Sequence, residues 1–261
     1  MVCSPGCAVA DALLEIERLS KRFGGVVASD AIALAIPQGE LHAIIGPNGA
    51  GKTTLIGQLA GEIAPDAGRI RFADRDVTGL PIFRRSQLGL ARSFQITSLF
   101  LDFTAIENVA LAVQAHAGHS FRFWRPARDE AELREPARAA LMRAGLAHRA
   151  DALVANLSHG EHRQLEIAVA LATSPRMLLL DEPMAGMGPE ESARMVKTLR
   201  ELKRELTILL IEHDMEAVFA LADRITVLVY GRIIASGTPE AIRANAEVRQ
   251  AYLGEQEARH G

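Results

Sequence analysis

Short apolar runs separated by turn residues open the chain. Leu13 to Ile16 and Ala31 to Ile36 have the length of strands, and Gly24-Gly25 and Gln38-Gly39 supply turns after them. Alternation of this kind indicates hairpin-like strands. A further apolar run, Leu41 to Ile45, leads directly into a glycine-rich turn. The first part of the chain is therefore expected to be rich in β-structure.

Helical periodicity follows that turn. A helix is expected to begin near Lys52 and to end at Gly61, because glycine commonly caps helix C-termini. The apolar face of this helix consists of Leu55, Ile56, Leu59 and Ala60. From Gln95 to Asn156 alanine, arginine and glutamate dominate, as in Asp129 to Leu146, which indicates a helical insert.

Strands and helices alternate in the remainder of the chain. Strands are expected at Met177 to Leu180, Leu206 to Ile211 and Ile225 to Tyr230, and helices at Leu157 to Thr173, Glu190 to Leu202 and Pro239 to Tyr252. This alternation predicts an α/β fold with a mostly parallel sheet whose faces are covered. An N-terminal antiparallel β-subdomain and the helical insert complete the predicted architecture.

Composition and charge narrow the class of protein. The chain has 261 residues, 49% of them hydrophobic and 23% charged, as in ordinary globular proteins. A net charge of -3 does not favour nucleic acid as an obligate partner. Two cysteines, Cys3 and Cys7, cannot staple the fold, which suits a reducing cytosol.

Membrane and export signals are not apparent in the sequence. No window approaches the roughly 20 consecutive apolar residues that cross a bilayer. Met1 to Ala10 lacks the charged head and apolar middle of a signal peptide. We therefore expect a soluble protein whose membrane association comes through a partner.

The glycine-rich turn fits G-x-x-x-x-G-K-[ST], the phosphate-binding P-loop, between a predicted strand and a predicted helix. Glycines let successive N–H groups turn inward around an anion, and the helix N-terminus adds its dipole. Lys52 can reach the β- and γ-phosphates of ATP, and the Thr53 hydroxyl can ligate Mg²⁺. The expected nucleotide contacts are Gly46, Pro47, Asn48, Gly49, Ala50, Gly51, Lys52, Thr53 and Thr54.

Two carboxylates end the apolar run that begins at Met177. A strand delivers them to the carboxyl edge of the sheet, where open α/β folds bind ligands. Asp181 is expected to hold Mg²⁺, directly or through water, and Glu182 to deprotonate the attacking water. The alternative is a solvated acidic loop after a core strand; the P-loop in the same chain favours the catalytic interpretation.

Ser158 and Glu161 have the spacing of a capping box at a helix N-terminus. Glycine in a first helical turn is costly, by up to ~1 kcal/mol. Gly160 therefore suggests that a group approaches the backbone closely there, and a phosphate would suit.

The order of these motifs resembles that of ATP-binding subunits of ABC transporters, over about residues 12 to 254. The motifs are the P-loop, Gln95, Leu157 to Glu161, Leu178 to Pro183 and Ile211 to Asp214. A narrower resemblance is to high-affinity branched-chain amino-acid uptake ATPases, whose close relatives serve urea or short amides. It lies in Arg92 to Gln95, Leu165 to Ala168, Ala185-Gly186, Ile211 to Met215 and Ala251 to Glu255.

The resemblance implies a P-loop NTPase fold with an ABC-type ATPase core, and roles for further residues. Phe23 matches the aromatic that stacks on adenine, with a hairpin core residue as the alternative. Gln95 matches the glutamine that contacts Mg²⁺ and water and couples to the membrane subunit. Ser158 and Gly160 match the signature that closes on ATP held by the opposite protomer. His213 matches the switch histidine that touches the γ-phosphate; a satisfied strand-edge histidine is the alternative.

The implied division of the chain has four segments. Residues 12–94 form the ATP-binding core with the P-loop, and residues 95–156 form a helical subdomain. Residues 157–238 hold the signature helix, the catalytic strands and the remainder of the core, and residues 239–261 form a helical tail. Within the insert, Phe121 to Arg125 contains the only tryptophan, and it either contacts the membrane subunit or folds over its own insert.

The sequence departs from the family pattern at two positions that bear on the coupling between ATP sites. His159 replaces the first of the usual paired signature glycines. Gly188 stands where the loop that communicates across the dimer has Asp or Asn. This leaves open whether the two ATP sites are less tightly coupled or the subunit works beside a different ATPase.

The expected function is that of an ATP-hydrolysing subunit that powers import of a small polar solute, best matched by branched-chain or hydrophobic amino acids. Its expected partners are a second ATPase subunit, membrane permeases and, indirectly, an extracytoplasmic solute-binding protein, at the cytoplasmic face of the membrane. Alternatives are a urea or short-amide importer, a lipopolysaccharide-export-type ATPase, a non-transport ABC ATPase and a P-loop kinase.

Overall fold

An antiparallel sheet is built from the first strands of the chain. The computed structural model describes residues 12–93, 99–117 and 131–251. Within these residues the first sheet has the strand order β2-β1-β4-β5. Its strands are β1 (Ala12–Phe23), β2 (Val26–Pro37), β4 (Ala67–Phe72) and β5 (Arg75–Asp76). β1 and β2 are joined through Gly24-Gly25, so the predicted hairpin and the predicted antiparallel subdomain are confirmed.

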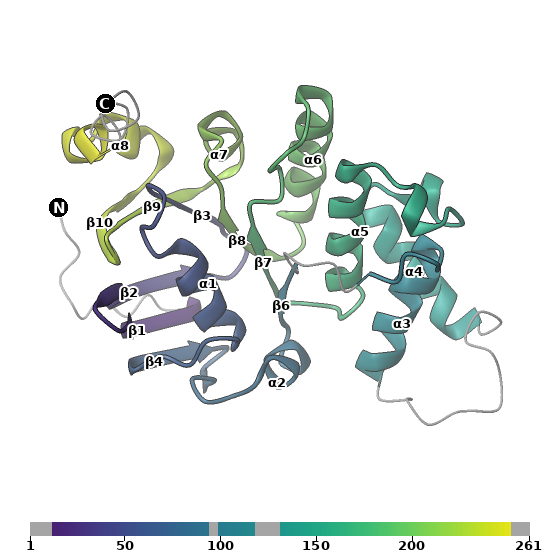
Figure 1. Cartoon of the computed structure of the whole chain (residues 1–261), viewed down its shortest axis with the longest axis horizontal. Coiled ribbons are helices and arrows are strands. Elements are labelled where there is room, and N and C mark those ends of the chain that lie inside the picture. Colours follow the sequence, from purple (N-terminus) through teal and green to yellow (C-terminus); the bar gives the residue numbers. More distant parts are fainter. Residues whose placement is uncertain (1–11, 94–98, 118–130, 252–261) are drawn as a thin grey trace.

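A mostly parallel sheet forms the centre of the molecule (Figure 1). In the described residues its strand order is β10-β9-β3-β8-β7-β6. The strands are β3 (Leu41–Ile45), β6 (Leu90–Arg92), β7 (Met177–Asp181), β8 (Thr207–Ile211), β9 (Arg224–Val229) and β10 (Arg232–Gly237). Only the pairing of β10 with β9 is antiparallel. The predicted sheet type is therefore confirmed.

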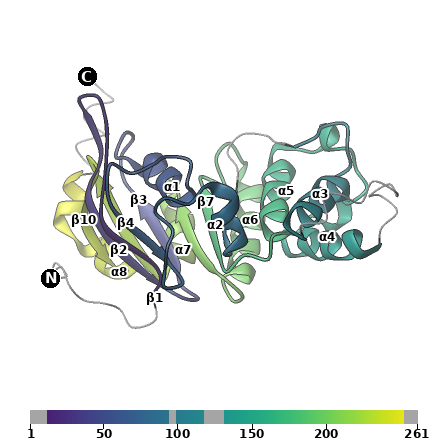
Figure 2. The same ribbon diagram turned by 90° about the horizontal axis from the view of Figure 1, so that it is seen from below.

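Helices cover both faces of this sheet. The helices are α1 (Lys52–Ala60), α2 (Ile82–Gln87), α3 (Ala105–Ala117), α4 (Ala131–Arg143), α5 (His159–Leu171), α6 (Pro189–Leu202), α7 (Met215–Leu221) and α8 (Pro239–Ala244), with short 3-10 turns at Ala147–Arg149 and Val154–Asn156. Figure 2 shows α3, α4 and α5 gathered at the end of the molecule opposite the antiparallel sheet. In the described residues no helix combines the length and the apolar character that crossing a membrane requires.

Alternate residues of the central strands serve two separate cores. Leu178 and Leu180 of β7 pack with α3, α4 and α5, whereas Met177 and Leu179 pack with α1 and the antiparallel sheet. Every residue of β3, β7 and β8 is buried, which explains why these strands have continuous apolar sequences. The strands are therefore held from both sides, and the loops at their ends start from fixed positions.

One predicted element is wrong in part. The tail helix predicted over Pro239 to Tyr252 is broken, because α8 ends at Ala244 and a second helix occupies residues 246–251. Asn245 causes the break: its side chain accepts hydrogen bonds from the N–H groups of Glu247, at 2.9 Å, and Val248, at 3.2 Å. Asparagine in this role begins a new helix.

Several residues singled out in the sequence lie outside the described residues. These are Cys3, Cys7, Gln95, Phe121 to Arg125 and Tyr252 to Glu255. By contrast, α1 begins at Lys52 and ends before Gly61, whose left-handed φ of 88° fits a glycine C-cap as expected.

Arg85 of α2 fixes the end of the helix that follows the P-loop. Its side chain is 2% exposed and donates to the carbonyl oxygens of Gln58 and Leu59, both at 2.7 Å, and of Leu80 and Thr78. Gln58 and Leu59 lie in the last turn of α1, where a helix leaves carbonyls without intrahelical partners and favours positive charge. Burial lowers the pKa of Arg85 to about 10, so the guanidinium keeps its charge at neutral pH.

Replacing this arginine should therefore destabilise the fold. We expect Arg85→Met to lower the free energy of unfolding by about 3 kcal/mol, because several buried carbonyl groups lose their donor. Urea denaturation followed by circular dichroism measures this loss. Arg84→Met, one residue earlier on the exposed face of α2, should change stability by less than about 0.5 kcal/mol. Equal losses in the two variants would contradict the role assigned to Arg85.

Candidate functional site

The parallel register brings the loops after four strands to one edge of the sheet. Ile211 at the end of β8 pairs with both Ile44 of β3 and Asp181 of β7. On the next strand Arg92 of β6 pairs with Leu179. The P-loop, the two acidic residues after β7, the histidine after β8 and the segment after β6 therefore all start at the same carboxyl edge, as expected for ligand sites of open α/β sheets.

The P-loop glycines are required by close backbone packing as well as by the turn itself. At Gly46 a Cβ atom would lie 2.0 Å from the carbonyl oxygen of Leu228 in β9. At Gly51, where φ is 102°, it would lie 2.1 Å from the carbonyl oxygen of Ala28 in β2. The loop is thus pressed between β9 and β2, and no side chain fits at either position.

Lys52 lies inside the loop that precedes it. Its side chain donates to the carbonyl oxygens of Gly46, at 2.7 Å, and Pro47, at 3.0 Å, and only 7% of the residue is exposed. Thr53, the next residue, is exposed at the start of α1. The N-cap of α1 is Gly51, which has no side chain to cap the helix, and the first turn of this helix has no acidic residue. The arrangement suits a bound anion at this helix N-terminus.

Asp181 is a buried carboxylate with one partnered and one unpartnered oxygen. Its Oδ2 accepts a hydrogen bond from Nη2 of Arg92 at 3.1 Å, while the buried Oδ1 has no hydrogen-bond partner among the described residues. Burial raises the pKa of Asp181, and the charges of Arg92 and Lys52 act against that rise. An orphaned carboxylate oxygen close to the P-loop lysine suits a hard cation such as Mg²⁺.

Glu182 and His213 face each other across neighbouring strands. His213 Nδ1 lies 3.9 Å from Oε1 of Glu182, and both side chains remain partly exposed. Glu182 itself has a left-handed φ of 48°. That conformation is uncommon for a non-glycine residue and turns the chain sharply just after Asp181. The structure thus brings together the residues expected to act as base and switch.

Glu212 organises the turns that carry these two residues. Its side chain is 1% exposed, and Oε1 accepts from the N–H group of Met184 at 2.9 Å. Oε2 accepts from the N–H groups of His213, at 3.1 Å, and Asp214, at 3.4 Å. Burial raises the pKa of Glu212, while these three N–H groups favour its charged form. One carboxylate therefore ties the loop after β7 to the loop after β8.

Phe23 lies at the turn end of the β1–β2 hairpin, where it pairs with Val26 across Gly24-Gly25. It is 50% exposed, which excludes the hairpin-core alternative. β2 also passes the P-loop at Ala28, so the hairpin end and the P-loop are neighbours. Lys21 lies over the Phe23 ring, 5.4 Å from its centroid.

Gln95 lies outside the described residues.

Ser158 caps α5 through the capping box that the sequence predicts. Its Oγ accepts from the N–H group of Glu161, and the Glu161 carboxylate accepts from the N–H group of Ser158 at 2.8 Å. Within the described residues, the hydrogen bonds of Ser158 link it to α5 and α6 rather than to the P-loop. The described residues that line the hollow beside Ser158 and Gly160 likewise include none of the P-loop.

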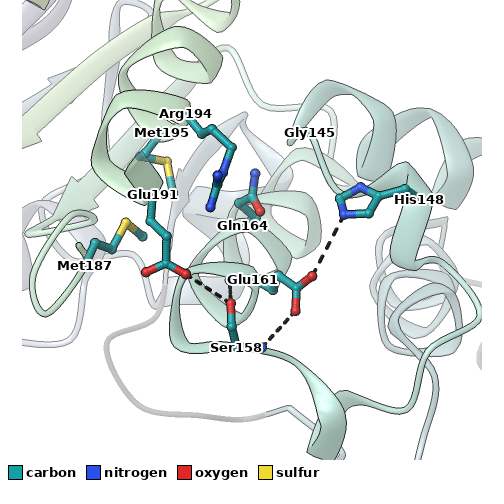
Figure 3. A pocket seen from close by; sticks show the side chains of 10 residues that line it. Gly145, His148, Ser158, Glu161, Gln164, Met187, Glu191, Arg194 and Met195 are labelled. Atoms are coloured by element: carbon teal, nitrogen blue, oxygen red, sulfur yellow. Dashed lines mark hydrogen bonds and ion pairs between the residues drawn. The ribbon is translucent and has the colours of Figure 1, made fainter. Parts of the chain in front are cut away.

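The space beside Gly160 is taken by a carboxylate, which refines the interpretation of this glycine. A Cβ at Gly160 would lie 2.8 Å from both Cδ and Oε1 of Glu191. Ser158 Oγ donates to the same Oε1 at 3.2 Å. Figure 3 shows Glu191 reaching from α6 to Ser158. Both residues line this hollow of about 310 Å³, together with Arg194 and Gln164. An anionic group does approach Gly160, but it belongs to the chain itself.

The two departures from the family pattern lie next to this contact. His159 Nε2 donates to the carbonyl oxygen of Ala185 at 3.1 Å, so it ties α5 to the loop after β7. Gly188 occupies the N-cap position of α6 with φ of -74°, a conformation open to any residue. Its lack of a side chain leaves α6 without the side-chain cap that Asp or Asn would supply, typically worth about 1 kcal/mol.

A phosphate-binding loop, a buried metal-type carboxylate and an acid–histidine pair on one sheet edge define a nucleotide-hydrolysing P-loop protein. Matches to known protein families agree with this class and identify the family within it. The family model described as ABC transporter matches residues 29–185, and the one described as branched-chain amino acid ATP-binding cassette transporter matches residues 232–258. The chain belongs to the family of ABC transporter ATP-binding proteins, and it is an ATPase.

Curated relatives match almost the whole chain. The high-affinity branched-chain amino acid transport ATP-binding protein BraF of Pseudomonas aeruginosa is 40% identical over 250 residues, covering 93% of this chain and 98% of BraF. LivG of Escherichia coli, which has the same description, is 40% identical over 255 residues with the same coverage. Among solved structures, the ADP conformation of the ATP-binding cassette MJ1267 has a TM-score of 0.82 at 30% identity, covering 94% of this chain and 100% of MJ1267.

Sequence reasoning missed three residues of the site. Arg92, Glu191 and Glu212 contact the predicted residues but were given no role of their own. For Glu212 and Arg92 a signal was present, because each is a charged residue at the end of an apolar strand, as Asp181 is. Glu191 gave no such signal, since it lies in an acidic first helical turn that reads as an ordinary solvated helix start.

The anchoring by Glu212 leads to a test. Glu212→Gln keeps the shape of the side chain but replaces one acceptor oxygen by a donor, so we expect the free energy of unfolding to fall by about 1–3 kcal/mol. Because burial raises the pKa of Glu212, the Glu212 carboxylate is protonated at a higher pH in the folded wild type than in the unfolded chain. The stability gap between wild type and variant should therefore widen from about pH 7 to about pH 5. Urea denaturation at both pH values measures it; a gap that narrows would contradict the assignment.

Proposed function

We propose that this ATPase powers the import of branched-chain or other hydrophobic amino acids. The match of residues 232–258 to the branched-chain amino acid transporter family is the observation that carries this choice. The descriptions of BraF and LivG support it. The chain also resembles the lipopolysaccharide export ATP-binding protein LptB of Acidithiobacillus ferridurans, at 34% identity over 245 residues, so lipid export is an outcome for the test to exclude. Import of urea or short amides is the second outcome that the test must exclude.

The proposed assembly has two ATPase subunits bound to membrane permeases at the cytoplasmic face of the membrane, with an extracytoplasmic solute-binding protein delivering the solute. Exposed apolar side chains within the proposed helical subdomain, residues 95–156, support a protein partner there. Phe100 and Phe103 stack at 5.3 Å between ring centroids, and Leu101 and Leu153 are exposed beside them. Clustered exposed aromatic and apolar side chains are typical of protein interfaces.

In the proposed cycle, the P-loop and Lys52 hold the phosphates of ATP while Phe23 stacks on the adenine. Lys52 exchanges its hydrogen bonds to the carbonyl oxygens of Gly46 and Pro47 for contacts with the β- and γ-phosphates. Residues 12–94 and 157–238 supply this core, and residues 239–261 are assigned to the tail.

Thr53, Asp181 and Gln95 are proposed to hold Mg²⁺, which neutralises negative charge on the phosphates when it is bound. The unpartnered Oδ1 of Asp181 supports this assignment. Glu182 then accepts a proton from the attacking water, and His213, 3.9 Å away, contacts the γ-phosphate. Catalysis of this kind consists mainly of positioning and charge stabilisation.

Ser158 and Gly160 are proposed to close on ATP held by the P-loop of a second subunit. In the lone chain the Glu191 carboxylate occupies this helix N-terminus, where one anion is favoured and two would repel each other. Glu191 must therefore move aside when a phosphate of the second subunit arrives. Because Glu191 loses its hydrogen bond to Ser158 when it moves, its displacement makes the free energy of dimerisation less favourable.

The proposed function is tested by uptake. In cells that lack the chromosomal copy, the wild-type gene should restore uptake of labelled leucine, isoleucine and valine. Glu182→Gln should bind ATP but restore less than about 1% of uptake, because the base contributes about 10²–10⁴-fold to rate. Lys52→Ala should lose ATP binding as well. Restored uptake of urea instead, or a defect confined to the outer membrane lipid, would reject the amino-acid proposal.

Removing the Glu191 carboxylate should make pairing easier. In the Glu182→Gln background, we expect Glu191→Ala to tighten ATP-dependent dimerisation roughly fivefold, since one hydrogen bond at a helix N-terminus is worth about 1 kcal/mol. Light scattering against protein concentration measures the effect. Glu190→Ala, which removes the same charge from the exposed neighbouring position, is the matched control. The same change in both variants would contradict a specific role for Glu191.

A further inference from the structure

A buried arginine links the metal-type carboxylate to the helix that follows the P-loop. Arg92 ends β6, and the residue is 9% exposed. Its Nη2 donates to Oδ2 of Asp181 at 3.1 Å, and its Nη1 forms an ion pair with Oε2 of Glu62. Glu62 follows Gly61 at the end of α1. The three residues form a continuous chain of charges from α1 across β6 to β7.

The arginine divides the two oxygens of Asp181 between two tasks. Oδ2 is bonded to Arg92, whereas Oδ1 is buried and has no hydrogen-bond partner among the described residues. A carboxylate with both oxygens unpartnered is free to rotate about its Cβ–Cγ bond. With Oδ2 held by Arg92, the group presents Oδ1 in a fixed direction.

Glu62 completes the balance of charge. A lone arginine beside a cation site would repel the cation, because buried like charges interact strongly. Glu62, which is one-third exposed, forms an ion pair with Nη1 of Arg92 and so offsets the positive charge of the guanidinium. The negative charge of Asp181 is then available to attract a cation. The planar guanidinium can bond both carboxylates at once, which a lysine ammonium cannot do with the same geometry.

We propose that Arg92 is a positioning residue for the metal that accompanies ATP: it holds Asp181 so that Oδ1 receives Mg²⁺, with Glu62 balancing its charge. The inference rests on the proposed function, because it takes Asp181 as a Mg²⁺ residue. It predicts that Arg92 governs the Mg²⁺ dependence of nucleotide binding and leaves metal-independent binding at the P-loop intact.

The test measures ATP affinity of the full chain with a fluorescent ATP analogue, first in EDTA and then in a Mg²⁺ titration. Loss of a residue that orients a metal ligand typically weakens metal affinity by 10–100-fold. We expect Arg92→Met to raise the Mg²⁺ concentration for the half-maximal gain in affinity by about that factor. Affinity in EDTA should change by less than about twofold, since the P-loop contacts are unaltered. Arg92→Lys should recover part of the loss, and Glu62→Gln should show a smaller one.

Arg85→Met is the matched control for a structural arginine. Arg85 is even more deeply buried than Arg92 but donates to backbone carbonyl groups, so its replacement should lower stability without moving the Mg²⁺ titration. Thermal melts of all variants identify those that fold. If Arg92→Met does not fold, the titrations of Arg92→Lys and Glu62→Gln decide the question.

The outcomes separate this inference from the proposed function. If wild type gains affinity with Mg²⁺ and Asp181→Asn loses that gain, the metal assignment stands. An unchanged Mg²⁺ titration in folded Arg92 and Glu62 variants then overturns the role of Arg92 alone. Equal losses in EDTA and in Mg²⁺ overturn it as well, because they indicate a general distortion of the P-loop. If wild type itself gains nothing from Mg²⁺, the metal assignment fails first, and the inference with it.

Discussion

The parallel register of β3, β8, β7 and β6 is the constraint on which the site depends. It aligns the ends of strands that are buried on both faces, so several charged residues at these ends lie next to a core. Lys52, Asp181 and Glu212 are all nearly fully buried at this edge. Buried charges persist only where they are paired or hydrogen-bonded. The edge therefore has to supply partners for each, and these partners fix the geometry of the loops.

The partners are of two kinds, and each kind has a different consequence. Backbone groups satisfy Lys52 and Glu212, which ties loop conformation to the charge itself. A side chain, Arg92, satisfies half of Asp181. The turn around Glu182 and His213 thus depends on Glu212, whereas the direction of Asp181 depends on Arg92. Changes at the two sites should therefore be independent, one acting on loop structure and the other on cation binding.

Local patterns in the sequence were sufficient for much of the fold and for part of the site. The P-loop, the acid pair after β7 and the capping box of α5 are contiguous, and the physical reason for each lies within a few residues. Arg92 and Asp181 are 89 positions apart, and Ser158 and Glu191 are 33 apart, so only the folded chain brings them together. The break at Asn245 is local, but the sequence did not reveal it. An asparagine that caps a helix within a polar segment looks the same in the sequence as an asparagine on the surface of one continuous helix.

Two of the side chains proposed to contact the nucleotide already have partners within the chain. Lys52 bonds the P-loop carbonyls, and Ser158 bonds Glu191. Binding at these points exchanges one interaction for another, and its net gain is small compared with the strength of either. Oδ1 of Asp181 differs, because it is buried and unpartnered among the described residues, and a cation there adds an interaction without removing one. A cation bound at Asp181 therefore satisfies a buried oxygen that the lone chain leaves without a hydrogen-bond partner among the described residues.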